Sequence, residues 1–358
     1  MDLPAPVHGM SNVNRAIYHE IKCTSLRMAV INTAPSYFSK LFGTRYWGVI
    51  KLIHTIICFV RLIAKLLFLD CKVAYRPING GLGQVYDLVY LIILRAFGQQ
   101  VIIHHHSYNY MNSKSTLFVL LNIIAGRSAR HIVLGTNMGS ILSSLYEISN
   151  SQITVVSNIV FFDTVKKNIP IIEVNRSTLV LGHLGNLCLA KGVDDFLLLC
   201  YELKLRRVDF EAKVAGPIAN AEVEEIIFNA CAELDEIEYL GALYGDAKDR
   251  FFSSLDVFVF PSKYKNEAEP LVLYEAGMHG VLNIGTRRGC MKSVIDQLGG
   301  VSVEEGSEVV THLADALEQQ IQTNGFEHAA RAKRLEAFVL ARKKARIVLE
   351  QVLTEMRA

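Results

Sequence analysis

Short apolar runs alternate with longer helical patterns along this chain, and this order is the feature that most limits its fold. In the first part of the chain we predict strands over 28–32, 71–75, 101–104 and 131–134, separated by helices over 45–69, 84–97 and 116–125. Strands that alternate with helices form a mostly parallel sheet with helices on both faces. The first part is therefore predicted to be a doubly wound α/β domain.

The same alternation begins again after about residue 175. Here we predict strands over 178–182, 210–215, 237–240, 257–260 and 281–284, and helices over 193–206, 221–234, 307–321 and 327–356. Lys166, Lys167 and Pro170 interrupt the pattern between the two series, which places the boundary near 160–176. Two Rossmann-like domains, residues 1–165 and 176–335, are thus expected to face a cleft, and ligands of such sheets bind outside the carboxyl ends of the strands.

The first domain is unusual at its amino-terminal end. The segment Val7–Asn12 has the pattern of a glycine-bearing turn, with Gly9 in it, which would follow a first strand. Only six residues precede this segment, and two of them are proline. Either the first strand is absent from this domain, or the natural start lies upstream of Met1.

Composition excludes several classes of protein. Hydrophobic residues make up 51% of the 358 residues and charged residues 20%, with 24 Gly and 8 Pro, which excludes a disordered chain, a collagen and a coiled coil. The 7 Cys are odd in number and form no C-x-x-C pair, so we expect reduced thiols in a cytoplasmic protein. No basic and aromatic pattern of an RNA-binding sheet is present, so nucleic acid is not expected as a partner.

Residues 40–65 are basic and apolar at once. Seven Lys and Arg and no acidic residue lie between Glu20 and Asp70, at positions 22, 27, 40, 45, 51, 61 and 65. Apolar side chains recur at near-helical spacing at positions 47, 50, 53, 57, 60 and 67. Two interpretations stay open: a helix on an anionic membrane surface, or a helix packed on a sheet with a solvated basic face. The one-sided charge favours peripheral contact with the inner face of a membrane.

The stretch 257–285 holds the strongest candidate site. A buried strand ends at Pro261-Ser262, a polar loop follows, and a helix begins near Pro270, which suits the first turn of a helix. Glu267 lies on the loop and Glu275 in the second turn of this helix, eight residues apart. Free N–H groups at a helix start favour a phosphate, and a carboxylate accepts hydrogen bonds from sugar hydroxyls.

The stretch 182–196 holds a second candidate. A strand leads into a loop, and Lys191-Gly192 stands where the next helix begins. A lysine in this position is a point charge that suits a diphosphate.

These two stretches resemble the GT-B glycosyltransferases of family four, which are retaining enzymes that use nucleotide sugars. The similarity covers essentially the whole chain. Leu181–Phe196 resembles the family's phosphate-binding loop, and the E-x7-E stretch is its most specific mark. Residues 104–107 resemble its histidine-bearing strand end, and 6–11 its glycine loop. The resemblance implies the GT-B architecture, with a final helix, residues 336–358, packing back towards the first domain.

The resemblance also implies roles for individual residues. Glu275 resembles the glutamate that binds the donor ribose, and Glu267 the catalytic glutamate that contacts the transferred sugar. Lys191 resembles the lysine that binds the diphosphate. The main-chain N–H groups of Leu271 and Val272 would meet the distal phosphate.

The resemblance implies two further site residues, and both lie in the first domain. His106 would contact the sugar as a second catalytic residue, and Gly9 would let the main chain approach the donor. The family uses no metal and no cofactor, because cationic side chains and a helix start neutralise the leaving diphosphate. The partners implied are a nucleotide-diphosphate sugar and a glycan or glycolipid acceptor in surface polysaccharide or lipopolysaccharide assembly.

Three adjacent histidines, His104, His105 and His106, invite a metal interpretation. Adjacent residues of a strand point to opposite faces of the sheet, so three in a row cannot all bind one ion. We therefore expect no metal site there.

The sequence departs from the family pattern at two places. Asn186 follows Gly185 where the family often has arginine, so the donor site lacks one cationic group unless Arg287 or Arg288 substitutes. Glu269 stands where an apolar or aromatic residue is common. The alternatives to an active transferase are a weak or inactive relative that acts as a binding scaffold, and a nucleotide-sugar epimerase.

Overall fold

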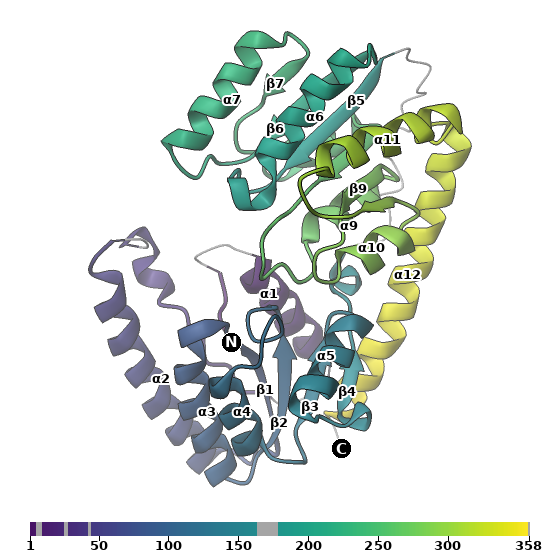
Figure 1. Cartoon of the computed structure of the whole chain (residues 1–358). Coiled ribbons are helices and arrows are strands. Elements are labelled where there is room, and N and C mark those ends of the chain that lie inside the picture. Colours follow the sequence, from purple (N-terminus) through teal and green to yellow (C-terminus); the bar gives the residue numbers. More distant parts are fainter. Residues whose placement is uncertain (5–8, 25–27, 42–43, 163–177, 357–358) are drawn as a thin grey trace. The chain divides into compact units, whose positions relative to one another are not determined.

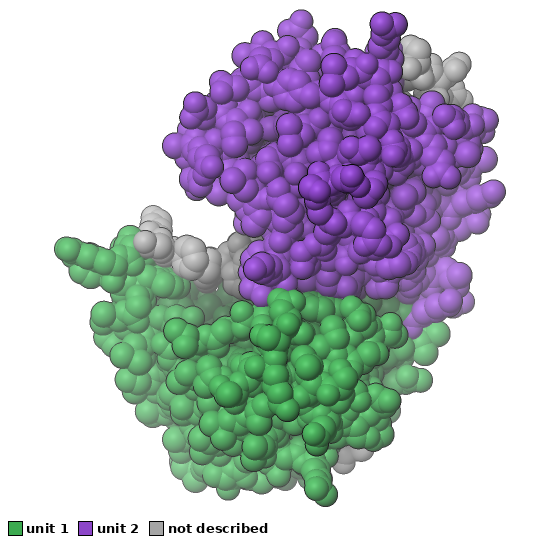
Figure 2. Space-filling view, in the orientation of Figure 1, with its two compact units in different colours: residues 1–161, 345–358 green, residues 162–344 purple. Residues whose placement is uncertain are grey.

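The computed structural model describes residues 1–4, 9–24, 28–41, 44–162 and 178–356, and within these it leaves out the side chains of residues 39 and 40. The chain divides into two compact units. Unit 1 comprises residues 1–161 together with 345–358, and unit 2 comprises residues 162–344 (Figure 2). The boundary expected near 160–176 falls mostly on residues outside the described part.

Unit 1 contains a four-stranded sheet in the order β1-β2-β3-β4, with every neighbouring pair parallel. Its strands are β1 (Val73–Ile78), β2 (Gln100–His105), β3 (Arg130–Val133) and β4 (Ile153–Val155), connected by the helices α3 (Gln84–Ala96), α4 (Thr116–Ala125) and α5 (Thr136–Tyr146) (Figure 1). The sequence sets these helix ends. Ser115 caps α4 by accepting a hydrogen bond from the N–H of Phe118, and Gly126 ends it at a φ of 77°.

The segment before β1 is helical and irregular. It contains α1 (Gly9–Lys22), the 3₁₀ helix η1 (Ser36–Leu41) and α2 (Trp47–Phe68). The prediction of a strand over 28–32 is wrong, because Met28–Thr33 adopts no strand in the structure. Among the described residues its main-chain partner is Met1, which donates to the carbonyl of Ile31 and accepts from the N–H of Thr33. One such bridge does not make a strand.

Unit 2 contains a six-stranded parallel sheet in the order β10-β9-β8-β5-β6-β7. The strands are β5 (Leu179–Leu184), β6 (Phe210–Ala215), β7 (Ile237–Tyr239), β8 (Val257–Phe260), β9 (Leu282–Thr286) and β10 (Val301–Val303). The helices are α6 (Val193–Leu205), α7 (Ala221–Glu233), α8 (Asp246–Ser253), α9 (Leu271–Met278), α10 (Met291–Gln297) and α11 (Val309–Gln322). Sequence reasoning predicted the first five strands and missed β10. The short 3₁₀ turns of the chain are η2 (Gly81–Gly83), η3 (Asn150–Gln152), η4 (Asn158–Phe161) and η5 (Leu189–Lys191).

The sheet of unit 2 packs against its helices in a large apolar core. Side chains of β5, β6, β8 and β9 are buried together with those of α6, α7 and α11, and Leu181, Phe196, Val214, Ile284 and Leu317 are almost completely inaccessible to solvent. Strands covered on both faces carry continuous apolar runs, as Val257–Phe260 does.

The last helix, α12 (His328–Glu355), begins in unit 2 and ends in unit 1. In unit 2 the buried side chains of Arg331 and Arg334 donate to the carbonyls of His279 and Gly280 at 3.0 and 2.8 Å. In unit 1 Arg346 forms an ion pair with Glu20 of α1, with 2.7 Å between the charged atoms. The predicted long final helix is therefore confirmed, and it is fixed to both units by arginine side chains.

Candidate functional site

The sheet order of unit 2 identifies the place where a ligand would bind. The chain runs from β5 outwards to β6 and β7, and then returns to β8, which lies on the other side of β5. Parallel sheets bind ligands at such a switch point, beyond the carboxyl ends of the two strands. In this chain the two segments that leave those ends are residues 185–192 and 261–270, which hold the two motifs predicted from the sequence.

Lys191 and Glu267 meet at this switch point. The Lys191 ammonium forms an ion pair and a hydrogen bond with Oε2 of Glu267, although 76 residues separate the two in sequence. The Ser262 hydroxyl donates to the same carboxylate oxygen at 3.1 Å. The Glu267 side chain is 9% exposed and that of Lys191 25%, so the pair is largely shielded from water while the lysine keeps access to solvent.

Close main-chain contacts hold the two loops together. The N–H of Lys263 donates to the carbonyl of Ala190 at 2.9 Å. Gly192 begins α6 at a φ of 79°, and a Cβ atom at this position would lie 2.1 Å from the carbonyl oxygen of Pro261. Glycine is required here by both the conformation and the contact. This contact explains how Lys191, on the loop after β5, reaches the carboxylate of Glu267, on the loop after β8.

Glu275 forms a second ion pair. It lies in the second turn of α9, and its Oε2 is 2.6 Å from the ammonium of Lys248 in α8. The N–H groups of Leu271 and Val272 belong to the first turn of α9, where a helix has no internal acceptors for them. Lys248 was not predicted, because nothing in the sequence of α8 marks one lysine among its charged residues.

Glu269 is buried and has a partner. Its side chain accepts a hydrogen bond of 2.5 Å from the Tyr274 hydroxyl, and both residues are at most 7% exposed. The unusual glutamate of the motif is therefore accommodated by a tyrosine of the following helix. An E-x4-Y spacing across a helix start is the signal that could have indicated this pair.

The loop after β9 supports Glu267 from another side. The N–H of Cys290 donates to the carbonyl of Ala268 at 2.8 Å, and Gly289 passes so close that a Cβ atom would lie 2.1 Å from the carbonyl oxygen of Glu267. The arginines of this loop are engaged elsewhere: Arg287 pairs with Glu304 and Arg288 with Glu305.

Asn186 differs from Lys191 and Glu267 in its surroundings. It is exposed in the loop between β5 and η5. Unlike Lys191, it is not drawn into the network around Glu267. The structure therefore places Asn186 on the correct loop without assigning it a role.

The histidines of unit 1 form a buried network at the end of β2. The Tyr75 hydroxyl and Nδ1 of His104 are 2.6 Å apart, and the rings of His104 and His106 are 4.0 Å apart. His105 contacts His131 instead, with 3.0 Å between their ring nitrogens. The predicted alternation is confirmed: His105 has different partners from its two neighbours. Among the described residues, no group of three His, Cys, Asp or Glu is placed to hold a metal ion.

Burial controls the charge of these histidines. Desolvation lowers the pKa of His106 to about 3 and that of His131 to about 4. Nε2 of His106 is buried, and within the described residues no group forms a hydrogen bond with it. His106 is therefore a neutral imidazole at physiological pH.

Gly9 opens α1, and the rest of its predicted glycine loop, residues 5–8, lies outside the described residues. Within the described part, a Cβ atom on Gly9 would meet nothing within 4 Å. The structure thus brings Lys191 and Glu267 together, gives Glu275 a separate partner in the same unit, and places Gly9 and His106 in unit 1.

A family model matches the part of the chain that holds this candidate site. Residues 165–334, just under half of the chain, match the model described as glycosyl transferases group 1. This part of the chain is therefore similar to that family of glycosyltransferases. It contains both loops of the switch point, together with Lys248 and Glu275.

Solved structures show the fold of the whole chain. Alr3699/HepE of Anabaena, solved in complex with UDP, is similar at a TM-score of 0.65 and 14% identity, over 95% of this chain and 89% of that protein. WaaG, described as a glycosyltransferase involved in lipopolysaccharide biosynthesis, has a TM-score of 0.60 and 13% identity, over 97% of each chain. A glycosyltransferase of Rickettsia africae has a TM-score of 0.61 and 11% identity, over 92% and 84%.

These similarities establish a GT-B fold: two Rossmann-like domains with parallel sheets and a long C-terminal helix. The comparison with curated protein sequences finds no match. The match over residues 165–334 and the fold together support a glycosyltransferase.

Proposed function

We propose that this chain is a retaining glycosyltransferase that moves a hexose-type sugar from a nucleotide-diphosphate sugar to a hydroxyl of a lipid-linked glycan. The observation that carries the proposal is the shielded Lys191–Glu267 pair at the switch point, in the part of the chain that matches the family model. A cation for a diphosphate and a carboxylate for a sugar are there in one place, beside the start of α9.

Each residue has a role in binding the donor. Glu275 accepts hydrogen bonds from the ribose hydroxyls, and the N–H groups of Leu271 and Val272 meet the distal phosphate. Lys191 exchanges its bond with Glu267 for the diphosphate, which frees the carboxylate to contact the transferred sugar. His106 contributes a neutral imidazole, and Gly9 a main-chain approach.

The reaction needs stabilisation of a leaving group. The bond between the anomeric carbon and the phosphate oxygen breaks, and a bond to the acceptor oxygen forms on the same face of the sugar. The acceptor proton moves to the leaving phosphate. Lys191 and the start of α9 stabilise the charge that develops on this phosphate, and no metal or cofactor takes part.

A binding protein without turnover is the second candidate. The exposed Asn186 favours it, together with the pairing of Arg287 and Arg288 with Glu304 and Glu305, because the diphosphate would then meet Lys191 without an arginine beside it. This candidate predicts donor binding without transfer. An epimerase, in contrast, would convert the donor in the absence of any acceptor.

Donor binding is tested by thermal unfolding of the chain with UDP, GDP, ADP, CDP and their common sugars, with and without a chelator. A ligand at a hundredfold excess over its Kd stabilises the native state by about 2.7 kcal/mol. We expect one base to raise Tm, with no effect of the chelator. Glu275→Ala should weaken that nucleotide about tenfold, because it removes a hydrogen bond to a charged group.

The matched control is Glu236→Ala, which removes a glutamate that is paired with Lys204. It should leave nucleotide binding unchanged. If no nucleotide raises Tm, or if Glu275→Ala binds as the unchanged chain does, the site is assigned wrongly. A single sugar-transfer assay with radiolabelled donor then separates a transferase from a binding protein and an epimerase.

We also propose that α2 contacts an anionic membrane surface. Of its 22 residues only Thr55 and Cys58 are buried. Apolar side chains more than one third exposed lie along the whole helix, at positions 49, 52, 53, 56, 57, 60, 63, 67 and 68. The cationic residues of this segment are Arg45, Lys51, Arg61 and Lys65, while the side chain of Lys40 lies outside the described part. No helix in the described residues has the length and apolar character to cross a membrane.

Co-sedimentation with vesicles checks this contact. The chain should bind vesicles that contain anionic lipid and not neutral ones, and binding should fall at high salt. Arg45→Glu combined with Arg61→Glu should reduce binding at least tenfold, since each cation contributes about 1 kcal/mol. Lys114→Glu with Arg127→Glu is the matched control, because it makes the same change of charge at exposed positions of the same unit. Equal loss with both double variants would contradict a role of α2.

A further inference from the structure

The ion pair of Lys248 and Glu275 presents one group of each sign at the same place in unit 2. Lys248 lies in the first turn of α8 and Glu275 in the second turn of α9. Oε2 of Glu275 is inaccessible to solvent and lies 2.6 Å from the Lys248 ammonium. The two side chains are 27% and 23% exposed, so both remain partly accessible to a ligand.

The helix α8 does not itself favour a lysine at this position. The N-terminal end of a helix carries a partial positive charge, so acidic residues such as Asp246 and Asp249 are stabilising there and a cation is not. The carboxylate of Glu275, on the neighbouring helix, compensates the charge of Lys248. The lysine therefore suits the carboxylate of α9 better than it suits its own helix.

His279 fixes α8 against α9 at a second point. The Ser253 hydroxyl and Nδ1 of His279 are 3.0 Å apart, and Nε2 of His279 lies 3.7 Å from Oδ1 of Asp249. His279 is buried, and it follows Glu275 by four residues, so the two side chains lie on the same side of α9. Lys248 thus meets Glu275 from a helix whose position is set one turn further along.

A cation and a carboxylate in contact suit a ligand with two adjacent hydroxyl groups. A carboxylate only accepts hydrogen bonds and an ammonium only donates them, whereas a hydroxyl does both. An ammonium has three donors, and the ion pair with Glu275 occupies at most one of them. A hydroxyl that donates to Glu275 therefore still has an oxygen that can accept from Lys248. The 2′ and 3′ hydroxyls of a ribose are such an adjacent pair.

We infer that Lys248 is a second ribose-binding residue: Glu275 accepts hydrogen bonds from the ribose hydroxyls of the donor nucleotide, and the Lys248 ammonium donates to the oxygen of one of them. This inference rests on the proposed function, in which Glu275 binds the ribose. Such a site selects ribonucleotides, because a deoxyribose leaves a charged group of the site without its partner.

Nucleotide analogues test this contact. UDP, GDP, ADP and CDP are titrated by calorimetry, and the one that binds is compared with its 2′-deoxy and 3′-deoxy forms. We expect each deoxy form to bind the unchanged chain about tenfold or more weakly than the ribonucleotide does, because a hydrogen bond to a charged group is lost. In Lys248→Met this ratio should fall at least threefold for one of the two deoxy forms and stay the same for the other.

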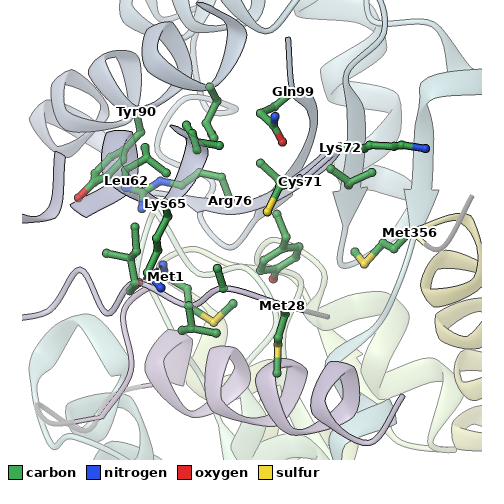
Figure 3. Close-up of a pocket in the computed structure, with 18 of the residues that line it drawn as sticks. Met1, Met28, Leu62, Lys65, Cys71, Lys72, Arg76, Tyr90, Gln99 and Met356 are labelled. Carbon is green, nitrogen blue, oxygen red and sulfur yellow. Dashed lines mark hydrogen bonds between the residues drawn. The ribbon is translucent and has the colours of Figure 1, made fainter. Parts of the chain in front are cut away.

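Two other lysines provide matched controls. Lys204→Met removes a lysine of unit 2 that is paired with Glu236. Lys72→Met removes a lysine of unit 1 that lines a cavity of about 390 Å³ beside β1 (Figure 3). Both variants should keep the two ratios of the unchanged chain.

The results separate a ribose contact from a lysine that only orients Glu275. If Lys248→Met weakens the ribonucleotide and both deoxy forms by the same factor, the lysine acts on Glu275 alone and our inference is wrong. Unchanged binding by Lys248→Met, or equal binding of ribonucleotide and deoxy forms by the unchanged chain, would also overturn it. In those cases a loss of binding in Glu275→Ala would still support the proposed function. If none of the four nucleotides binds, the proposed function fails and the ribose contact fails with it.

Discussion

Replacing Glu267 by glutamine is expected to lower the turnover of sugar transfer about a hundredfold or more, with little loss of donor affinity. The carboxylate is shielded from water and bound to Lys191 and Ser262, so its charge acts in a medium where electrostatic interactions are strong. The transition state of glycosyl transfer develops positive charge on the sugar ring. Removing one preorganised charged group from such a site typically costs a factor of 10² to 10³ in rate.

The same variant, Glu267→Gln, should bind the donor about as tightly as the unchanged chain does, or more tightly. Glutamine keeps the volume of the side chain and an oxygen that can accept from Ser262, so the loop after β8 should keep its position. Lys191 loses its anionic partner and becomes free for the diphosphate. We therefore expect the Kd of the donor, measured by calorimetry, to stay equal or to fall, while kcat falls.

Two further variants complete this test. Lys191→Met should raise the donor Kd as well as lower kcat, because the diphosphate loses its cation. Glu236→Gln removes a glutamate that is paired with Lys204 and should change neither constant by more than twofold. If Glu267→Gln turned over as fast as the unchanged chain, the carboxylate would have no part in the chemistry.

Sequence reasoning predicted this candidate site because its residues stand in short, ordered motifs. Glu267 and Glu275 follow a buried strand and a Pro-Ser turn at fixed spacing, and Lys191 stands at a helix start. Lys248 and the hydroxyl of Ser262 complete the site, yet their roles depend on which loops meet in space. That meeting follows from the order of β5, β8 and β9 in the sheet, which no local pattern contains.

At two places in the fold, the sequence pattern also failed to predict whether a strand is present. Residues 28–32 have an apolar pattern that suits a strand, but a strand also needs a neighbour. In the described part of the chain, Met1 is the main-chain partner of this segment. Val301–Val303 was missed for the opposite reason: its three residues are too few for a periodic signal, while its pairing with β9 makes it a strand. Local pattern therefore predicts the capacity to form a strand, and the neighbouring chain decides whether the strand forms.

A large loss of stability is expected from Gly192→Ala. At a φ of 79° any residue with a Cβ atom costs about 1–2 kcal/mol. The new atom would also lie 2.1 Å from the oxygen and 2.7 Å from the carbon of the Pro261 carbonyl, and both belong to main chain that cannot turn aside as a flexible side chain can. We expect a loss of about 3 kcal/mol or more for unit 2, seen as a fall of about 6 °C or more in Tm.

Gly241→Ala separates the contact from the conformation. Gly241 has a similar φ of +69°, but within the described residues its Cβ atom would meet nothing within 4 Å. It should therefore cost only the 1–2 kcal/mol of the left-handed conformation. Because Gly192 joins the Lys191 loop to the loop of Ser262, its variant should also lose nucleotide binding at a temperature where it is still folded, while Gly241→Ala keeps it. Equal losses in both variants would mean that the contact with Pro261 does not hold the two loops of the site together, and that the Lys191–Glu267 pair forms without it.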